Sequence, residues 1–514
     1  MGQHNINGLR VSDESLSLVR QQLAGMGFTD DLIKATFNVG SATSGLTFYD
    51  LDAVAKRLYP VLTPLRNEIP RVAGEGGTAT NWRSITAVDT TSVPLGVSAG
   101  VRGGVITVTT QDNTAAYVTL GQEASQPFEA EMAARGFDDL RALQAQLLLE
   151  SVMIGEEKLL VGGNGSVALG TTPTVSATGA ITGGTLAAAT FHVRCIALSY
   201  SAYQIASLAL GLPTTIAVVS ADGGTTTNVN GGAAQVSADA TGVVASGTTG
   251  SIACTVTAVP GAVAYAWMLS AGGGAAGSEV LNQITTVNAA TLTATRTTVT
   301  PGAGFADTVG TAFNADRSVN SLVFDGLISI CAKSGSGAYV ASLDNAALTT
   351  DSAGGITQIN TALKSFWDNK KLSPDTIWVA AQEQQNITSK VIAGGGTPLF
   401  RFVGDMNSGA AQGMAVGGSL VGAYLNKFAM GGAINIPVKL HPNIPAGTIL
   451  FTSKRLPYPV SNVGNPLQVK AQEEYRQWEW PLRTRSYETG VYVREVLQCY
   501  FPPAFGMINN IQNG

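Results

Sequence analysis

The sequence predicts an α+β protein that carries an inserted all-β sandwich, and three stretches support this. Residues 137–158 are rich in strong helix formers and contain no proline. Residues 167–310 nearly lack charge and repeat short β-type runs between turn residues. From Ser321 onward, helical and strand-like segments follow one another again. The order indicates a long helix, then a β module, then a mixed domain.

The first 60 residues have the pattern of an N-terminal arm. A helix can begin at the cap Ser12, and residues 49–59 form a second short amphipathic pattern before Pro60. The segment is thinly connected to the rest of the chain. We expect such an arm to pack on a neighbouring molecule rather than on its own core.

Residues 61–166 contain two strand-like runs on either side of a long excursion. Residues 82–88 and 105–110 alternate like strands, and the stretch between them has few large apolar anchors. This pattern predicts an extended hairpin at residues 74–112. An isolated two-stranded ribbon is only marginally stable in water, so we expect the hairpin to need a partner.

The long helical run follows Gly136 and ends at the glycine-rich turn of residues 162–165. Its expected extent is residues 127–162, because Pro127 suits a first helical turn. At ~1.5 Å per residue the run is a rod of roughly 35–40 Å. One stripe is expected to be mostly apolar, with Phe137, Leu140, Leu143 or Gln144, Leu147, Ser151 and Ile154. Such a helix needs a sheet or another helix to cover that stripe.

The charge-poor region, residues 167–310, predicts a β-sandwich. Its expected strands are residues 191–198, 215–219, 251–257, 264–269 and 290–294. The strand-turn-strand pattern of residues 259–267 resembles immunoglobulin-like or fibronectin-like modules of bacterial and phage proteins. A linker of low complexity is the alternative, and the β alternation counts against it.

After the module, residues 311–451 predict a compact α/β domain. Helices are expected at 322–332, 357–367 and 382–391, a buried strand at 374–380, and further strands at 434–440 and 448–451. Residues 452–514 are more polar and contain two long strand-like runs, 467–480 and 487–499. These runs are expected to close the sheet begun near Val105, which would join both ends of the chain in one domain.

Composition limits the possible functions. The chain has 514 residues, a net charge of -5 and only 13% charged residues, so no global attraction to nucleic acid or anionic membrane is indicated. Four widely spaced cysteines predict reduced, buried thiols rather than a zinc site or a disulfide framework. The polar N-terminal residues and the lack of an 18-residue apolar run predict a protein made and kept in a cytoplasm, with no membrane partner.

No motif for catalysis stands out. The phosphate-binding GxxxxGK[ST], the zinc-protease HExxH and the hydrolase GxSxG patterns are all missing. Only His4, His192 and His441 could act as a histidine base, and none has a nearby nucleophile or carboxylate in sequence. We therefore expect no enzyme activity, no cofactor and no metal site, and a hydrolase with a nonstandard site is the remaining enzymatic alternative.

Paired charges and aromatic residues are better explained as contacts than as catalysts. Two glutamate pairs could bind a metal or act as acid and base, but solvated faces or salt bridges between subunits explain them better. Arginines alternate with glutamates in the tail, as in ladder pairing or contacts with a neighbour. The tail tryptophans could stack on a base, although anchoring a protein contact suits them better. The candidates for contacts between subunits are Trp82, Arg102, Glu156, Glu157, Glu473, Glu474, Arg476, Trp478, Trp480, Arg483 and Arg485.

The order of these parts resembles the major capsid protein of tailed bacteriophages, with its Hong Kong ninety-seven type of fold. Residues 137–165 are similar to that family's spine helix, 74–112 to its extended loop and 321–451 to its axial domain. Residues 61–73 with 468–500 would form its peripheral domain. The resemblance implies hexamers and pentamers that tile an icosahedral shell around double-stranded DNA, which is contacted nonspecifically and weakly. It places residues 167–310 on the outside of the shell.

The same resemblance implies partners and a location. A portal and a separate scaffolding protein are expected, a decoration protein is possible, and the site of action would be the virion capsid, assembled in the host cytoplasm. No motif for covalent cross-linking can be placed. Two alternatives remain open: an encapsulin-like compartment shell, and a surface adhesin or surface-layer protein that uses its sandwich to bind carbohydrate or a host surface.

Overall fold

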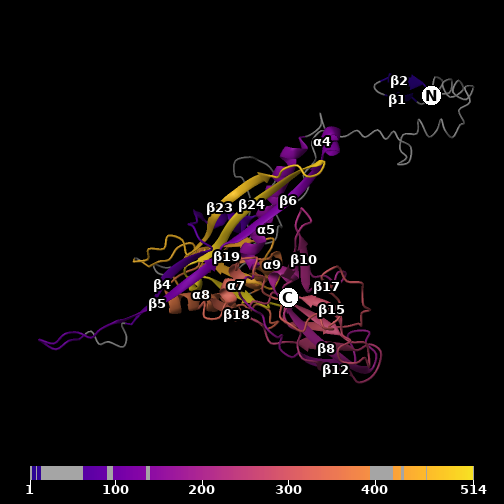
Figure 1. Ribbon diagram of the computed structural model, residues 1–514. Coiled ribbons are helices and arrows are strands. Elements are labelled where there is room, and N and C mark those ends of the chain that lie inside the picture. The colour runs from indigo at the N-terminus through magenta and orange to yellow at the C-terminus, as the bar shows by residue number, and fades with distance from the viewer. Residues whose placement is uncertain are drawn as a thin grey trace, which may run out of the picture. The chain divides into compact units, whose positions relative to one another are not determined.

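A computed structural model describes residues 3–6, 9–12, 62–89, 96–134, 139–393, 421–429, 433–458 and 460–512. The chain divides into two compact units, residues 1–59 with 131–140, and residues 60–130 with 141–514. The first unit contains the antiparallel strands β1 (Gln3–Ile6) and β2 (Leu9–Ser12). The helix expected after Ser12 and the one expected at residues 49–59 lie outside the described residues. The other described sheets belong to the second unit (Figure 1).

A four-stranded sheet joins distant parts of the chain. Its order is β3 (Arg71–Ala73), β23 (Leu467–Glu479), β24 (Ser486–Cys499) and β6 (Val118–Pro127), with β3 parallel to β23 and the other neighbours antiparallel. The predicted return of the tail to the early part of the chain is confirmed. The expected partner strand near Val105 is wrong, because β24 pairs with β6 instead of the hairpin.

The long helix covers this sheet. Its range is α5 (Leu140–Gly162), and a separate helix α4 (Phe128–Ala134) precedes it. Leu148 and Val152 pack against Val491 and Val493 of β24. The predicted glycine stop is confirmed, whereas a single helix over residues 127–162 is wrong, because α4 and α5 are separate helices and Asp139 before α5 is not helical.

The predicted apolar stripe of α5 lies on the wrong face. Leu147 is 37% exposed and Ser151 is exposed, whereas Leu148, Val152 and Leu160 are buried. The reason is local, because leucine occupies positions 147, 148 and 149 in succession. Periodicity alone therefore allows adjacent stripes, and the contact with β24 selects the one that is buried.

The extended hairpin is present. Strands β4 (Ala79–Asp89) and β5 (Thr107–Ala116) pair antiparallel and form a two-stranded sheet without further strands. The register shifts between Ile85 and Ala87, as at a β-bulge. Figure 1 shows the described part of the connection, residues 96–106, extending beyond the ends of the two strands.

A six-stranded sheet and three helices form the largest core. The strand order is β18 (Tyr339–Ser342), β25 (Gly506–Asn509), β22 (Ile449–Thr452), β19 (Thr376–Val379), β21 (Ile434–Leu440) and β20 (Ala423–Asn426). The helices are α7 (Leu327–Ala332), α8 (Thr357–Lys370) and α9 (Ala381–Ala393), and a 3-10 turn spans Pro502–Ala504. All four residues of β19 are buried, as expected for the strand at 374–380.

The inserted segment folds as two facing sheets. One contains β12 (Ala240–Val244), β8 (Ala189–Leu198), β14 (Ala264–Leu269) and β15 (Val280–Thr285), and the other contains β16 (Ala289–Leu292), β13 (Ser251–Thr255) and β7 (Ser176–Ala180). Phe191, Tyr265 and Trp267 fill the core between them. The sequence prediction did not foresee a second core on the other face of β14, formed by Ala266 and Met268 with residues such as Phe313.

Smaller elements cover the second face of the four-stranded sheet and help to form the second core. They are α6 (Tyr200–Ile205), β9 (Leu212–Pro213) paired with β17 (Phe305–Ala306), and the hairpin of β10 (Thr215–Val219) and β11 (Thr226–Asn230). Leu212 and Val309 contribute to the second core. The four-stranded sheet of the module is therefore covered on both faces by its own chain.

The end of α5 meets the start of α7 at a glycine contact. A side chain at Gly163 would lie 2.4 Å from the carbonyl oxygen of Phe324, and one at Gly326 would lie 2.3 Å from that of Leu159. The Gly326 amide donates to the Gly163 carbonyl at 2.8 Å. Both positions need glycine because two backbones approach within hydrogen-bonding distance.

Candidate functional site

Glu156, on the buried face of α5, is the centre of an ionic cluster. Its Oε2 accepts from Arg66 Nε at 2.7 Å, and its Oε1 accepts from Arg71 Nη1 at 2.5 Å. The Tyr475 hydroxyl also donates to Oε2. Arg66 and Arg71 lie 5.2 and 5.3 Å from the centre of the Tyr475 ring, so both also make cation–π contacts.

Arg71 extends the cluster to the sheet. Its Nη2 donates to Glu495 Oε2 at 2.6 Å and to Glu474 Oε2 at 3.1 Å. The Glu495 side chain is fully buried, whereas that of Glu474 is 59% exposed. One guanidinium therefore connects α5, β23 and β24, and this connection holds the helix on the sheet.

Glu157 binds a different set of groups. Its two carboxylate oxygens accept from the backbone amides of Leu65 and Arg66, at 2.9 and 2.7 Å, at the start of α3 (Pro64–Glu68). Oε1 also accepts from His441 Nε2 at 2.6 Å. His441 Nδ1 accepts from the Asn443 amide at 3.1 Å, so the ring proton belongs on Nε2. Glu157 thus caps one helix and anchors the turn after β21.

These contacts correct the predicted role of the first glutamate pair. Glu156 and Glu157 are both fully buried and bonded within the chain, so the expected solvated face is wrong. Sequence reasoning missed Arg66, Arg71 and His441, since sequence separations of 85 to 284 residues carry no local signal.

Glu68, at the end of α3, adds another ionic contact. Its carboxylate binds Lys439 at 2.5 Å and Lys454 at 3.1 Å. Burial by itself would raise the pKa of Glu68, but the two lysines outweigh that effect and lower it. The short helix α3 is therefore tied at its start to α5 and at its end to the six-stranded sheet.

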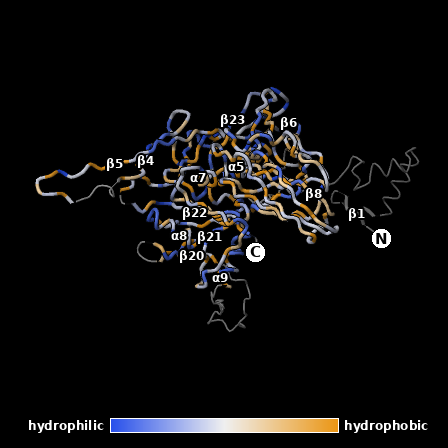
Figure 2. The backbone as a smooth tube through the Cα atoms, turned by 90° about the horizontal axis from the view of Figure 1, so that it is seen from below, coloured by the Kyte–Doolittle hydropathy of each residue, from blue (hydrophilic) through white to orange (hydrophobic). Residues whose placement is uncertain are grey.

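The hairpin offers a large apolar surface. Ile85 is 68% exposed, Val105 is 89% exposed, and Val101, Ile106 and Val108 are also exposed. Arg102 lies in the same exposed stretch. Figure 2 shows apolar residues recurring along the thin extension beyond β4 and β5. In one chain this surface faces solvent, which favours an intermolecular contact.

Most of the remaining predicted contact residues lie near the end of β23 and in the connection to β24. Arg476 lies 4.0 Å from the centre of the Trp478 ring and forms an ion pair with Glu473 at 3.5 Å. Trp478 and Trp480 are 37% and 40% exposed. Arg483 pairs with Asp222 at 3.7 Å and Arg485 with Glu129 at 2.8 Å. Each of these arginines is therefore paired with a nearby carboxylate. The contact of these residues with other subunits stays a prediction.

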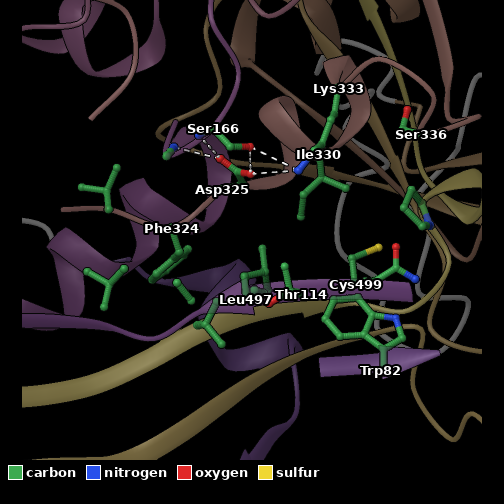
Figure 3. Close-up of a pocket in the computed structure, with 18 of the residues that line it drawn as sticks. Trp82, Thr114, Ser166, Phe324, Asp325, Ile330, Lys333, Ser336, Leu497 and Cys499 are labelled. Carbon is green, nitrogen blue, oxygen red and sulfur yellow. Dashed lines mark hydrogen bonds and ion pairs between the residues drawn. The ribbon is translucent and has the colours of Figure 1, made fainter. Parts of the chain in front are cut away.

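A cavity of about 540 Å³ lies at the base of the hairpin. Figure 3 shows Trp82, Leu497 and Cys499 in the lower part of the view, and Asp325 and Lys333 above them. The Asp325 carboxylate accepts from the Ser166 hydroxyl at 2.5 Å, and Lys333 Nζ donates to that hydroxyl at 3.3 Å.

The side chains that line this cavity favour a packing role over a catalytic one. Burial raises the pKa of the Cys499 thiol, so the reactive thiolate is disfavoured. Trp82 packs edge-on against Tyr500 at 5.7 Å, and its buried Nε1 has no hydrogen-bond partner among the described residues. The other cysteines, Cys195, Cys254 and Cys331, are also free and buried, as the sequence predicted.

One group of side chains in the module has the composition of a metal site. His192, Asp239 and Glu279 place their ligand atoms within 4.8 Å of one another. However, His192 Nδ1 is hydrogen-bonded to Asp239 at 2.7 Å, and Arg194 lies 3.3 Å from Glu279 and 3.8 Å from Asp239. The guanidinium already supplies the positive charge that a metal would bring, so the group is an ion-pair cluster.

No family model and no curated protein matches the chain. Solved structures that resemble it include the capsid of a native GTA particle, which has 7% identity, a TM-score of 0.40, and coverage of 91% of this chain and 97% of that one. The holo-SrpI encapsulin complex from Synechococcus elongatus PCC 7942 has 9% identity, a TM-score of 0.39, and coverage of 90% and 93%. The capsid of Myoviridae Phage XM1 has 10% identity, a TM-score of 0.36, and coverage of 89% and 95%.

In the part of the chain that the structure describes, no helix is both long enough and apolar enough to span a bilayer.

Proposed function

We propose that the chain is a shell-forming structural protein, the major capsid protein of a tailed bacteriophage. The observation that carries the proposal is the hairpin of β4 and β5, whose apolar side chains are exposed in the single chain. A two-stranded ribbon with such a surface gains stability only when other chains cover it. A subunit in a closed shell has neighbours on all sides that can do so.

The sheets fit the parts of such a subunit. The four-stranded sheet with α5 would be the peripheral domain with its spine helix, and the six-stranded sheet would be the axial domain. Residues 167–310 would form the inserted module on the outer surface. The buried ionic cluster around Glu156 supports the role of α5 as a strut, because it connects the helix to two other segments.

The partners follow from the same proposal. Copies of the chain would form hexamers and pentamers, with a portal and a separate scaffolding protein during assembly. Packaged double-stranded DNA would be contacted weakly and without sequence preference, in keeping with the net charge of -5. A decoration protein could bind the outer surface.

The test compares assembly of the full chain with that of a hairpin variant. Electron microscopy of the purified wild-type protein should show closed shells or hexameric rings. Val105→Asp with Ile106→Asp should abolish them, because two charges would enter the buried contact, while the far-UV circular dichroism spectrum stays unchanged. A wild-type protein that stays monomeric at high concentration and with its scaffold would contradict the proposal.

Shells whose assembly is unaffected by the two aspartates would show that the hairpin is not the contact. A matched control is Thr226→Asp, in the exposed hairpin of β10 and β11, which should assemble normally. The contents of wild-type shells separate two functions, since nucleic acid indicates a capsid and a protein cargo indicates a compartment shell.

A further inference from the structure

Two carboxyl groups lie buried around one guanidinium where α5 meets the sheet. Arg71 donates from Nη1 to Glu156 at 2.5 Å and from Nη2 to Glu495 at 2.6 Å. Both glutamate side chains have no exposed surface. Two like charges repel each other strongly in a buried environment of low dielectric constant, and burial also removes the hydration of each charge.

One oxygen of the pair lacks a donor. Glu495 Oε1 is buried and has no hydrogen-bond partner among the described residues. Glu156, in contrast, receives donors from Arg66, Arg71 and Tyr475. A buried acceptor without a donor is costly. A proton on Glu495 Oε1 removes the cost, because the carboxyl group then donates to the neighbouring carboxylate of Glu156.

We propose that Glu156 and Glu495 share one proton at and below neutral pH, and that its loss loosens the contact between the end of α5 and the sheet. The Glu156–Glu495 pair then makes the contact between α5 and the sheet sensitive to pH. This proposal concerns a single chain and stands whether or not the chain forms shells.

The surrounding charges allow both protonation states. Arg66 faces the pair from α3, Arg71 from β3, and Tyr475 and Glu474 from β23, whereas β6 offers the apolar Val118 opposite Glu495. With both carboxyls ionised, two arginines balance two glutamates. With the proton bound, the exposed carboxylate of Glu474, 3.1 Å from Arg71, balances the remaining positive charge.

The titration has a defined direction. Burial, followed by the charge of Glu156, raises the pKa of Glu495 from 4.5 to about 7, against the opposing effect of Arg71. A carboxyl whose pKa is raised on folding stabilises the folded state most at low pH. That stabilisation declines as the pH rises from about 4.5 to about 7, and it is constant above that range.

Hydrogen exchange of the full chain between pH 5 and 8.5 tests whether the contact between α5 and the sheet depends on pH. After correction for intrinsic rates, amides of residues 152–162 and of β24 should lose protection by up to about tenfold per pH unit below pH 7. Glu495→Gln should remove this dependence, because the amide donates to Glu156 without titrating. Glu473→Gln, which removes an exposed carboxylate of the same strand that pairs with Arg476 rather than with Arg71, is the matched control and should follow the wild type.

Infrared spectroscopy gives a second readout. A protonated-carboxyl band present at pH 5.5 should disappear by pH 8.5 in the wild-type protein and should be weaker at pH 5.5 in Glu495→Gln, in which only buried groups such as Glu383 remain to contribute. Protection that does not change with pH, or a Glu495→Gln protein with the wild-type slope, would overturn the proposal. Should Glu495→Gln fail to fold, the lack of a titrating infrared band would be the decisive negative result.

Discussion

The inserted module and the extended hairpin are both poor in charge, yet they differ in what covers them. Every side chain of β14 in the module is buried, with Tyr265 and Trp267 facing one core and Ala266 facing another. In the hairpin, the first six residues of β5 are all exposed. Low charge is thus no sign of assembly by itself. What matters is whether layers of the same chain cover the strands.

The largest effect should come from the module core. Trp267→Ala is expected to cost about 3–5 kcal/mol of unfolding free energy, because a fully buried ring is replaced by a cavity. Urea unfolding followed by circular dichroism measures this. Trp478→Ala, at a partly exposed ring, should change stability by less than about 1 kcal/mol. Equal losses of unfolding free energy in the two variants would show that the core around Trp267 does not stabilise the module.

A smaller loss is expected at the buried junction. Glu157→Ala removes the acceptor for His441 and for two amides of α3, and should cost about 3 kcal/mol. Thermal unfolding reports the loss. Glu129→Ala removes an exposed glutamate and serves as the control. A Glu157→Ala protein as stable as the Glu129→Ala control would mean that water satisfies the donors of His441 and α3 with no loss of unfolding free energy.

The ion pairs of Glu68 should contribute less and depend on pH. Glu68→Gln is expected to cost about 0.5–1 kcal/mol at pH 7, since both lysines are partly exposed. The pKa of Glu68 is lowered on folding, so its contribution is present above the unfolded pKa and is lost as the pH falls through the folded pKa. The difference in unfolding free energy between wild type and variant should therefore be smaller at pH 3 than at pH 7. A difference as large at pH 3 as at pH 7 would contradict this assignment.

The smallest effect on stability is expected in the hairpin. Val105→Ala should change the unfolding free energy of the unassembled chain by less than about 0.5 kcal/mol, because that side chain is 89% exposed. The measurement is urea unfolding at low protein concentration. A loss above about 1 kcal/mol would mean that the hairpin packs on its own chain, and the contrast with the module would disappear.

Much of the secondary structure could be predicted from periodicity. Strands β10, β14 and β21 match their expected ranges, and β8, α8 and α9 lie within a few residues of theirs. The paired strands of the hairpin and the buried β19 were also predicted. In each case a short run of residues carries the signal, through alternation in strands and helical spacing in helices.

The sequence by itself determined the order of elements, the glycine stop of α5 and the lack of charge in the module, because these are properties of neighbouring residues. Only the tertiary structure decided which face of α5 is buried, that β24 pairs with β6, and that Glu156 lies between Arg66 and Arg71. Those outcomes depend on residues 85 or more positions apart along the chain. No local pattern encodes such distances, since the free energy that selects them arises only when the segments pack together.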